Sequence, residues 1–534
     1  MLRADRSLLA SSVIVCLGLL SFDAGAQNSR PTAKAKSAPV AASDIELPLD
    51  LLLAATVART DQAKLIRIEQ LAGESAAVRA AAPLDPTIRA NATLIRNDLD
   101  QATPSNVDRT DVAAVSTSVS KLLPTGTVVG AEIGHRRTEL ERTGNVGGGG
   151  PQGGGAAGAG GPDAFHETNA AVSVRQRLWR DGFGVATADR QRSADLARTA
   201  AEFSANAQLE RLAMQTVDIY HRTWSTQVQI RSSRERVTRQ ERLLTASRQK
   251  LNLGTMEQSD FLQLETSVLA VRDQIADLEK QLGDTWRGLV LAAKLGDDWL
   301  IRDPMTINLS ITPASGAREA GQRICASAPG DQFAGLASVR ALSQQVESLD
   351  AALSATRSQS KPDLFAEVRL ATNSVDERMR VTVPETGRGR HPQVTIGAGI
   401  EMTLGGSADR AAIVDATRAK TRAEVQLSTD RDNANLRWMT ACRDLERLVR
   451  RQDLLATTAN KLSERVRLEA RRFDVGKADI SAAIRAEDDL ATTALQKSRV
   501  DAEVSQLEWT LTELRGELGK RIEIAVRKLD EVAR

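Results

Sequence analysis

Residue types that could carry out chemistry are few and scattered in this sequence. Its four histidines, His135, His166, His221 and His391, have no metal-ligand spacing. The stretch 147–161 is almost pure glycine and alanine, but it lacks the Gly-Lys-Ser/Thr ending of a phosphate-binding loop. No Gly-x-Ser-x-Gly turn and no dinucleotide fingerprint appears in a suitable context. We therefore predict a protein that is not an enzyme and that uses no cofactor and no metal.

The bulk composition favours long packed helices. The 534 residues carry 71 basic and 69 acidic side chains, a formal net charge of +2, with no basic block that would indicate nucleic-acid binding. Aromatic residues make up only 3% of the chain, which is low for a compact enzyme of this length. Abundant Ala, Leu, Arg and Glu with few aromatics is typical of helical bundles.

The N-terminus has the pattern of a secretion signal. Two arginines precede an apolar run at 8–20, and 24–26 reads Ala-Gly-Ala. This predicts a signal peptide over 1–26, cleaved before Gln27. The apolar run is too short to cross about 30 Å of hydrocarbon as a helix.

Two cysteines remain after that cleavage, Cys325 and Cys442. In an oxidising compartment they could pair. They could equally be two unrelated buried thiols, and spacing alone does not decide between these alternatives.

The strongest signal in the sequence is an internal duplication. Gly254 and Gly476 lie 222 residues apart, and each is followed by a long series of apolar residues spaced by 3 and 4. Adding 222 to the series from Phe261 to Leu289 lands on the second series. Such spacing is typical of a coiled-coil seam, and its matching phase indicates duplication. We expect two helical hairpins turning at these glycines, the first with a helix over about 185–250 that is about 100 Å long.

Each half begins with a shorter helix, expected at 48–82 and near 333–361, that is followed by period-two alternation. Strands are expected at about 84–180 and 362–405. In the cleanest stretch the apolar residues are Val394, Ile396, Ala398, Ile400, Met402 and Leu404. Alternating strands of about ten residues suit a transmembrane barrel, with an ordinary half-buried sheet as the alternative.

Three segments interrupt these strands. The glycine-rich stretch 147–161 and the polar stretch 376–391 are expected to be loops on the outer side. The stretch 112–137 alternates as well and contains a Leu-Pro-Thr-Gly turn at 123–126. It is expected to add a hairpin, which leaves the number of strands open.

Several short motifs occur in a duplicated order. They are Arg-Leu-Trp-Arg-Asp-Gly-Phe-Gly at 177–184, Lys-Pro-Asp-Leu at 361–364, Thr-Leu-Gly-Gly-Ser at 403–407, Leu253-Gly254-Thr255 and Val475-Gly476-Lys477. Together they resemble the TolC-like outer membrane factor family over essentially the whole mature chain. The two glycine motifs are similar to the hairpin tips of that family, and the others to its junctions between strands and helices.

The resemblance implies an α+β membrane protein. Its duplicated hairpins and strands would form a shared trimeric outer-membrane β-barrel, with four strands from each protomer, and a periplasmic α-helical tunnel. The implied divisions are a first repeat at 27–296, an equatorial linker at 297–332, a second repeat at 333–519 and a tail at 520–534.

The implied function is an exit duct for a tripartite efflux pump or a type I secretion system, in the outer membrane of a Gram-negative bacterium and reaching into the periplasm. Its partners would be two further copies, the lipid bilayer, a periplasmic adaptor and an inner-membrane RND, ABC or MFS transporter, with no nucleic acid. The alternatives are a periplasmic adaptor, which would have one hairpin, and a coiled-coil scaffold without a pore. Neither the cargo nor the pump is indicated.

The resemblance also implies roles for single residues. The two tip motifs would contact the adaptor. Some relatives carry acidic residues six and nine positions after the second tip glycine, at the periplasmic aperture. Here Ala482 and Arg485 stand in those places, while Asp260 is acidic in the first repeat. A ring of Arg485 would favour anions, with a solvated coiled-coil arginine as the alternative. The implied belt around the tunnel would bring Cys325 near Cys442 and pair them.

Overall fold

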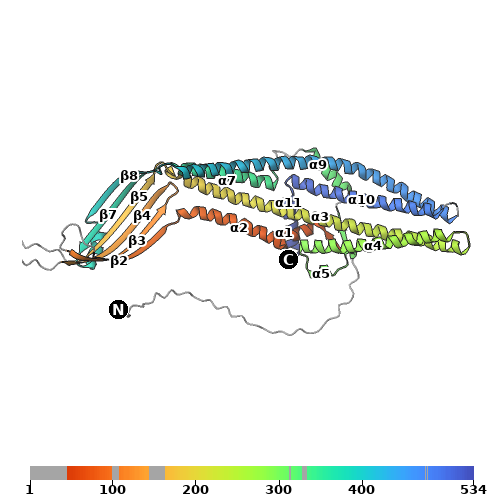
Figure 1. Ribbon diagram of the computed structural model, residues 1–534, viewed down its shortest axis with the longest axis horizontal. Coiled ribbons are helices and arrows are strands. Elements are labelled where there is room, and N and C mark those ends of the chain that lie inside the picture. The colour runs from red at the N-terminus through yellow and green to blue at the C-terminus, as the bar shows by residue number, and fades with distance from the viewer. Residues whose placement is uncertain are drawn as a thin grey trace, which may run out of the picture. The chain divides into compact units, whose positions relative to one another are not determined.

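The computed structural model describes residues 45–98, 107–142, 163–311, 314–327, 333–475, 477 and 479–533. The predicted signal peptide at 1–26, the glycine-rich loop at 147–161 and Gly476 lie outside the described residues. The part from Ile45 onward forms one unit, in which a β-sheet continues into a layer of long helices (Figure 1).

The sheet has six strands, all antiparallel, in the order β2-β3-β4-β5-β7-β8. They are β2 Thr87–Asn97, β3 Val107–Leu122, β4 Thr127–Arg142, β5 Ala164–Arg177, β7 Asp363–Asp376 and β8 Pro392–Glu401. The sheet thus has two strands more than the four per protomer that the resemblance implies. The reason is the additional hairpin β3–β4, which turns at the predicted Leu-Pro-Thr-Gly sequence and lies between β2 and β5.

Over the part of the strands nearer the helices, the register gives the two faces of the sheet opposite characters. At the outer end, the charged residues Arg96, Asp111, Arg137 and Glu139 lie on the same face as Val172. Val172 on β5 lies opposite Ala131 on β4 and Leu370 on β7, so these apolar residues share one face. Exposed apolar residues on this face are Ile88, Leu94, Val115, Ile133, Val172, Val174, Leu370, Val394 and Ile396. The other face carries Glu132, Asn169, Ser173, Arg175, Glu367, Arg369, Gln393 and Thr395.

The predicted pair of long hairpins is confirmed. The first consists of α3 Val185–Asn252 and α4 Gln258–Ala293, the second of α9 Ser407–Asp474 and α10 Ile480–Leu514. Equivalent seam positions are buried in both, since Leu264 and Leu289 in α4 match Ala486 and Leu511 in α10.

Among the described residues, we find no helix that is both long enough and apolar enough to cross a membrane.

The shorter helices flank these hairpins. They are α1 Leu49–Arg59, α2 Asp61–Ala81, α5 Asp297–Leu300, α6 Ala314–Ala326, α7 Ala337–Gln359, α8 Met379–Gly387 and α11 Leu518–Ala533, with short 3-10 turns η1 Ala82–Leu84, η2 Gly182–Gly184 and η3 Pro304–Thr306. The single helix expected at 48–82 is interrupted at Thr60, whose backbone is extended (ψ 149°). The Thr60 hydroxyl accepts a hydrogen bond from the Ala63 N–H (3.2 Å) and so caps α2.

Three expected irregular segments contain regular structure. Residues 297–332, expected as a linker, include β6 Ile307–Ser310, which pairs in parallel with β1 Ile45–Pro48. The expected tail at 520–534 is occupied by α11, because Leu518, Ile522 and Ala525 form a buried stripe at helical spacing. The expected polar loop at 376–391 contains α8, whose buried Thr386 donates a hydrogen bond to the Thr168 carbonyl on β5 (3.0 Å).

Candidate functional site

The hydrogen bonds that flank the two hairpin tips match at positions 222 residues apart. In the first, the Leu253 N–H donates to the Gln249 carbonyl (3.1 Å) and the Thr255 N–H to the Lys250 carbonyl (2.9 Å). In the second, the Val475 N–H donates to Arg471 (3.2 Å) and the Lys477 N–H to Arg472 (2.8 Å). The bonds donated by Thr255 and Lys477 are of the 6→1 type found at a Schellman helix end, and in the first tip the Gly254 N–H completes that motif by donating to the Leu251 carbonyl (3.0 Å). The two glycine-containing motifs, at 253–255 and 475–477, thus lie at equivalent helix ends.

Gly254 supplies the left-handed residue in the first tip. Its φ is +69°, and a Cβ built there would meet nothing within 4 Å, so the conformation and not crowding favours glycine. The side chains next to the turns are free of packing, with Leu253 77% exposed and Val475 68% exposed. Two apolar side chains therefore stand in solvent at the tips.

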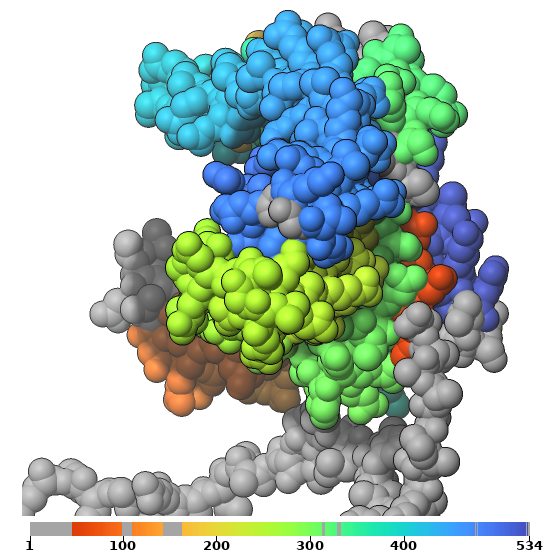
Figure 2. All heavy atoms as spheres, turned by 90° about the vertical axis from the view of Figure 1, so that its right-hand side faces the viewer, coloured from red at the N-terminus to blue at the C-terminus, as the bar shows by residue number. Residues whose placement is uncertain are grey.

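The two tips of one chain are held against each other. The Lys250 ammonium at the end of α3 lies 3.9 Å from the centre of the Phe473 ring near the end of α9 and also donates to the Phe473 carbonyl. Leu264 of α4 and Ile480 of α10 pack with Phe473 in one buried cluster. Figure 2 shows this end of the molecule, with the blue residues of α9 and α10 lying on the yellow-green first hairpin.

A second link joins α3 to α10 behind the tips. The Arg239 Nε donates to both carboxylate oxygens of Glu487 (3.0 and 3.1 Å). Glu487 is only 2% exposed, so Arg239 and not water supplies the hydrogen bonds and the opposite charge that its carboxylate needs. About one turn earlier on α3, Arg236 pairs with Asp488, the residue that follows Glu487 on α10.

The residues compared with the aperture of relatives lie on α4 and α10. Asp260 is half-buried in the first turn of α4, and Ala482 is half-buried at the equivalent place in α10. Arg485 is exposed, and its Nε donates to the Ser481 carbonyl one turn earlier (3.1 Å). A hydrogen bond from Ser481, with the nearby Arg485 charge as a smaller cause, lowers the pKa of Asp479.

A compact core lies midway along the helices. Cys325 in α6 and Cys442 in α9 form a disulfide. The Tyr220 hydroxyl of α3 donates to the Leu47 carbonyl of β1 (3.0 Å) and accepts from the Ser310 N–H of β6 (2.9 Å). These two bonds attach the small parallel sheet to the long helix.

This region contains a buried carboxyl that the sequence did not single out. Glu210 of α3 is 8% exposed, and burial raises its pKa to about 7. A backbone hydrogen bond from Gly519, in the first turn of α11, opposes that shift. Because Gly519 lies far along the sequence, no local pattern marks Glu210 as special.

The junction from β5 to α3 contains two strained residues. Asp181 (φ +50°) and Phe183 (φ +53°) both have left-handed backbones. The Asp181 carboxylate accepts from the Thr187 N–H (2.9 Å) and the Thr187 hydroxyl (2.7 Å), which fixes the start of α3. Phe183 is exposed beside this junction.

No protein-family model and no curated protein matches the sequence. Similar solved structures are the outer membrane protein VceC of Vibrio cholerae (11% identity, TM-score 0.61, covering 88% of this chain and 96% of that chain) and the outer membrane channel CmeC of Campylobacter jejuni (12%, 0.61, 91% and 90%). A third is the outer membrane channel MtrE of Neisseria gonorrhoeae in its open state (13%, 0.57, 88% and 89%). At these identities the likeness concerns the fold, so the chain has the tunnel-and-barrel fold of outer membrane channels.

Proposed function

We propose that this chain is one protomer of a trimeric outer-membrane channel-tunnel of the TolC-like type. The observation that carries the proposal is the division of the sheet into an exposed apolar face and a polar face. In a barrel, lipid would solvate the first face and a water-filled lumen the second. The sheet continues into helices of 68 residues each, α3 and α9, long enough to extend the lumen as a tube.

The duct would serve a tripartite efflux pump or a type I secretion system. In this arrangement the strands lie in the outer membrane of a Gram-negative bacterium and the helices reach into the periplasm. The exposed Leu253 and Val475 support a docking role for the tips, since apolar side chains in solvent suit contact with the hairpins of a periplasmic adaptor. The adaptor would couple the duct to an inner-membrane RND, ABC or MFS transporter.

A pair of adjacent substitutions tests the membrane part. Val172→Lys places a charge on the apolar face of β5, and Ser173→Lys places the same charge on the polar face. A lysine facing the middle of the bilayer costs roughly 2–4 kcal/mol, whereas a lysine facing the lumen costs little. We expect V172K to lower the yield of heat-modifiable trimers in outer membranes several-fold, and S173K to retain both trimers and single-channel conductance. Equal yields from the two variants would contradict a lipid-facing sheet.

At the other end of the duct, we propose that three copies of Arg485 ring the aperture and favour anions. Its exposure near the tip supports this role. Arg485→Asp should shift ion selectivity in planar bilayers toward cations, because each copy changes from a positive to a negative charge. The same change at Arg499, exposed on the same helix but farther from the tip, is the control. Unchanged selectivity in R485D would refute the ring.

A further inference from the structure

The additional hairpin β3–β4 is attached to the sheet at its helix-side end. Gly126, in the hairpin turn, and Gly184, in the junction before α3, both have left-handed backbones (φ +71° and +80°). A Cβ on Gly184 would lie 1.9 Å from the Pro124 carbonyl oxygen, and one on Gly126 would lie 2.7 Å from the Gly184 nitrogen. The two backbone segments are thus in direct contact, which glycine at both positions permits. A turn held in this way stays in the sheet.

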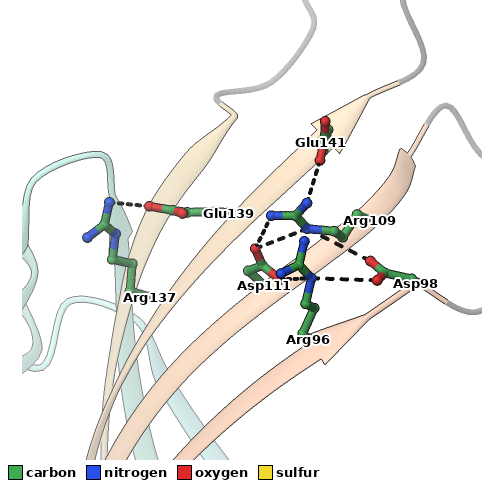
Figure 3. Close-up of polar contacts among 7 residues, drawn as sticks. All are labelled: Arg96, Asp98, Arg109, Asp111, Arg137, Glu139 and Glu141. Carbon is green, nitrogen blue, oxygen red and sulfur yellow. Dashed lines mark hydrogen bonds and ion pairs between the residues drawn. The ribbon is translucent and has the colours of Figure 1, made fainter. Parts of the chain in front are cut away.

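Charged side chains connect the same hairpin to β2 at the outer end of the strands (Figure 3). Asp111 of β3 pairs with Arg109 on its own strand (2.7 Å) and with Arg96 of β2 (4.0 Å). Arg109 also pairs with Glu141 of β4 (3.0 Å) and with Asp98, just after β2 (3.8 Å). Single exposed pairs contribute little, but this network joins three neighbouring strands. The hairpin is therefore fixed at both ends as an integral part of the sheet.

The two edge strands of the sheet have the directions and lengths needed for β8 of one copy to pair with β2 of the next. Among the strands that the structure describes, β2 and β8 each pair on one side only. Since β2 follows α2 and β8 leads into α9, the two strands run in opposite directions, and their lengths are similar, 11 and 10 residues. A β8 strand beside the β2 strand of another copy would thus continue the antiparallel alternation. Within lipid such edges need partners, because no water is present to satisfy their backbone groups.

The helices next to these edges are matched as well. The layer runs α2-α3-α7-α9, so α2 and α9 are its outer members. Exposed apolar residues on α2 include Leu65, Ile68 and Val78, and those on the sheet-side half of α9 include Val414, Val425 and Leu436. The α9 residues recur every eleven positions and therefore form one stripe along the helix. Seating α2 of one copy on α9 of the next would cover both sets.

By simple spacing, the width of the helix layer is nearer to that of six strands than to that of four. Four helices packed at about 8–10 Å occupy roughly 32–40 Å. A strand in a tilted barrel, with a spacing of about 4.8 Å and a tilt of about 40°, takes about 6.3 Å of circumference. Six strands then occupy about 38 Å, whereas four occupy about 25 Å.

We propose that three copies close a barrel of eighteen strands, six from each copy, in which β8 of each copy pairs with β2 of the next. This proposal rests on the proposed channel function. By the same spacing, the backbone diameter is about 36 Å, against about 24 Å for a barrel with four strands per copy. The barrel cross-section is therefore roughly twice that of the four-strand arrangement. The consequence is room for a larger cargo at the outer end of the duct.

Cysteine cross-linking tests this arrangement in outer-membrane vesicles from cells making the full chain. Ala92→Cys on β2 is combined in turn with cysteine at Val394, Ile396 or Ala398 on β8, three positions that allow for the unknown register between copies. The matched series replaces Ala92→Cys with Ala131→Cys on β4, which would be the neighbour of β8 if β2 and β3 stood outside the barrel. A third combination, Ala92→Cys with Val172→Cys on β5, would form a disulfide within one chain if the β3–β4 hairpin stood outside the barrel, and such a disulfide overturns the eighteen-strand barrel. All six positions lie on the apolar face.

The expected result is covalent trimers after oxidation in at least one β2–β8 combination and none in the β4 series. The native chain, whose Cys325 and Cys442 are bonded to each other, gives the background. Covalent trimers in the β4 series, or in neither series, overturn the eighteen-strand barrel. Conductance and heat modifiability of the same vesicles report on the proposed function separately. Conducting trimers linked through β4 refute the wide barrel alone, and absence of trimers refutes both proposals.

Discussion

Replacing Glu210 by glutamine should stabilise the protein at alkaline pH and leave it nearly unchanged at acidic pH. Burial on α3 raises the pKa of this carboxyl to about 7, and the negative charge of Glu513 adds to the shift. The Gly519 N–H and the Arg340 charge oppose it without cancelling it. The folded protein therefore favours the protonated, neutral side chain. Glutamine keeps an oxygen that can accept from Gly519 but cannot ionise.

The size of the effect follows from the pKa difference. The pKa of Glu210 rises from 4.5 to about 7 on folding, and each unit corresponds to about 1.4 kcal/mol, so ionisation costs roughly 3 kcal/mol of folding free energy. Because the folded pKa is raised, the stability that neutral Glu210 contributes is complete below about pH 4.5 and is lost as the pH rises through about 7. At pH 8 nearly all of this loss should be present in the native protein and absent in E210Q.

Thermal unfolding of detergent-solubilised trimers, followed by circular dichroism at pH 5 and pH 8, measures this difference. The midpoint of E210Q should exceed that of the native protein at pH 8, and by only about a quarter as much at pH 5. Glu202→Gln, a more exposed carboxyl on the same helix, serves as the control and should show no such pH-dependent gap. A gap between E210Q and the native protein that is equal at both pH values would refute the assignment of a buried, neutral carboxyl.

Two further predictions concern the junction and the tips. Gly184→Ala should lower the yield of folded trimers far more than Gly182→Ala, because a Cβ at 184 would collide with the Pro124 carbonyl while one at 182 would meet nothing within 4 Å; heat-modified gels report the difference. Arg239→Met should lower the free energy of unfolding by roughly 3–5 kcal/mol, because it leaves the Glu487 carboxylate buried without a partner. Adding Glu487→Gln should restore most of that free energy, as measured by denaturant unfolding. Equal stability of R239M and the double variant would show that the pair is not coupled.

The long hairpins could be predicted because their signals are local and repeated. The seam that includes Leu264 and the turn at Gly254 each need only neighbouring residues to be recognised. The Leu-Pro-Thr-Gly turn likewise indicated a hairpin at 123–126. That this hairpin lies between β2 and β5 depends on strand pairing and on the contact of Gly126 with Gly184, which local alternation does not encode.

The segments that were missed depend on distant partners. The helix α8 contains Pro384, which disfavours helix, and tertiary contacts such as that of Thr386 with β5 accompany it. The helix α11 does carry a visible stripe at Leu518 and Ile522, but the repeat pattern ends there and a tail was the simpler expectation. For Glu210 the deciding feature is burial against α11, which spacing does not reveal.

The core around Tyr220 determines when the chain can finish folding. Its cluster includes Leu47 and Leu49 near one end of the sequence and Trp509, Leu518 and Ile522 near the other. It therefore cannot close until almost the whole chain has been synthesised, whereas the first hairpin ends at Ala293 and its local contacts can form earlier. Until the core closes, its apolar residues on the first hairpin, such as Trp286 and Leu289, are uncovered and open to aggregation. Closure of this core would be the late step in biogenesis, and a chain truncated before Leu518 would lack the segment that completes it.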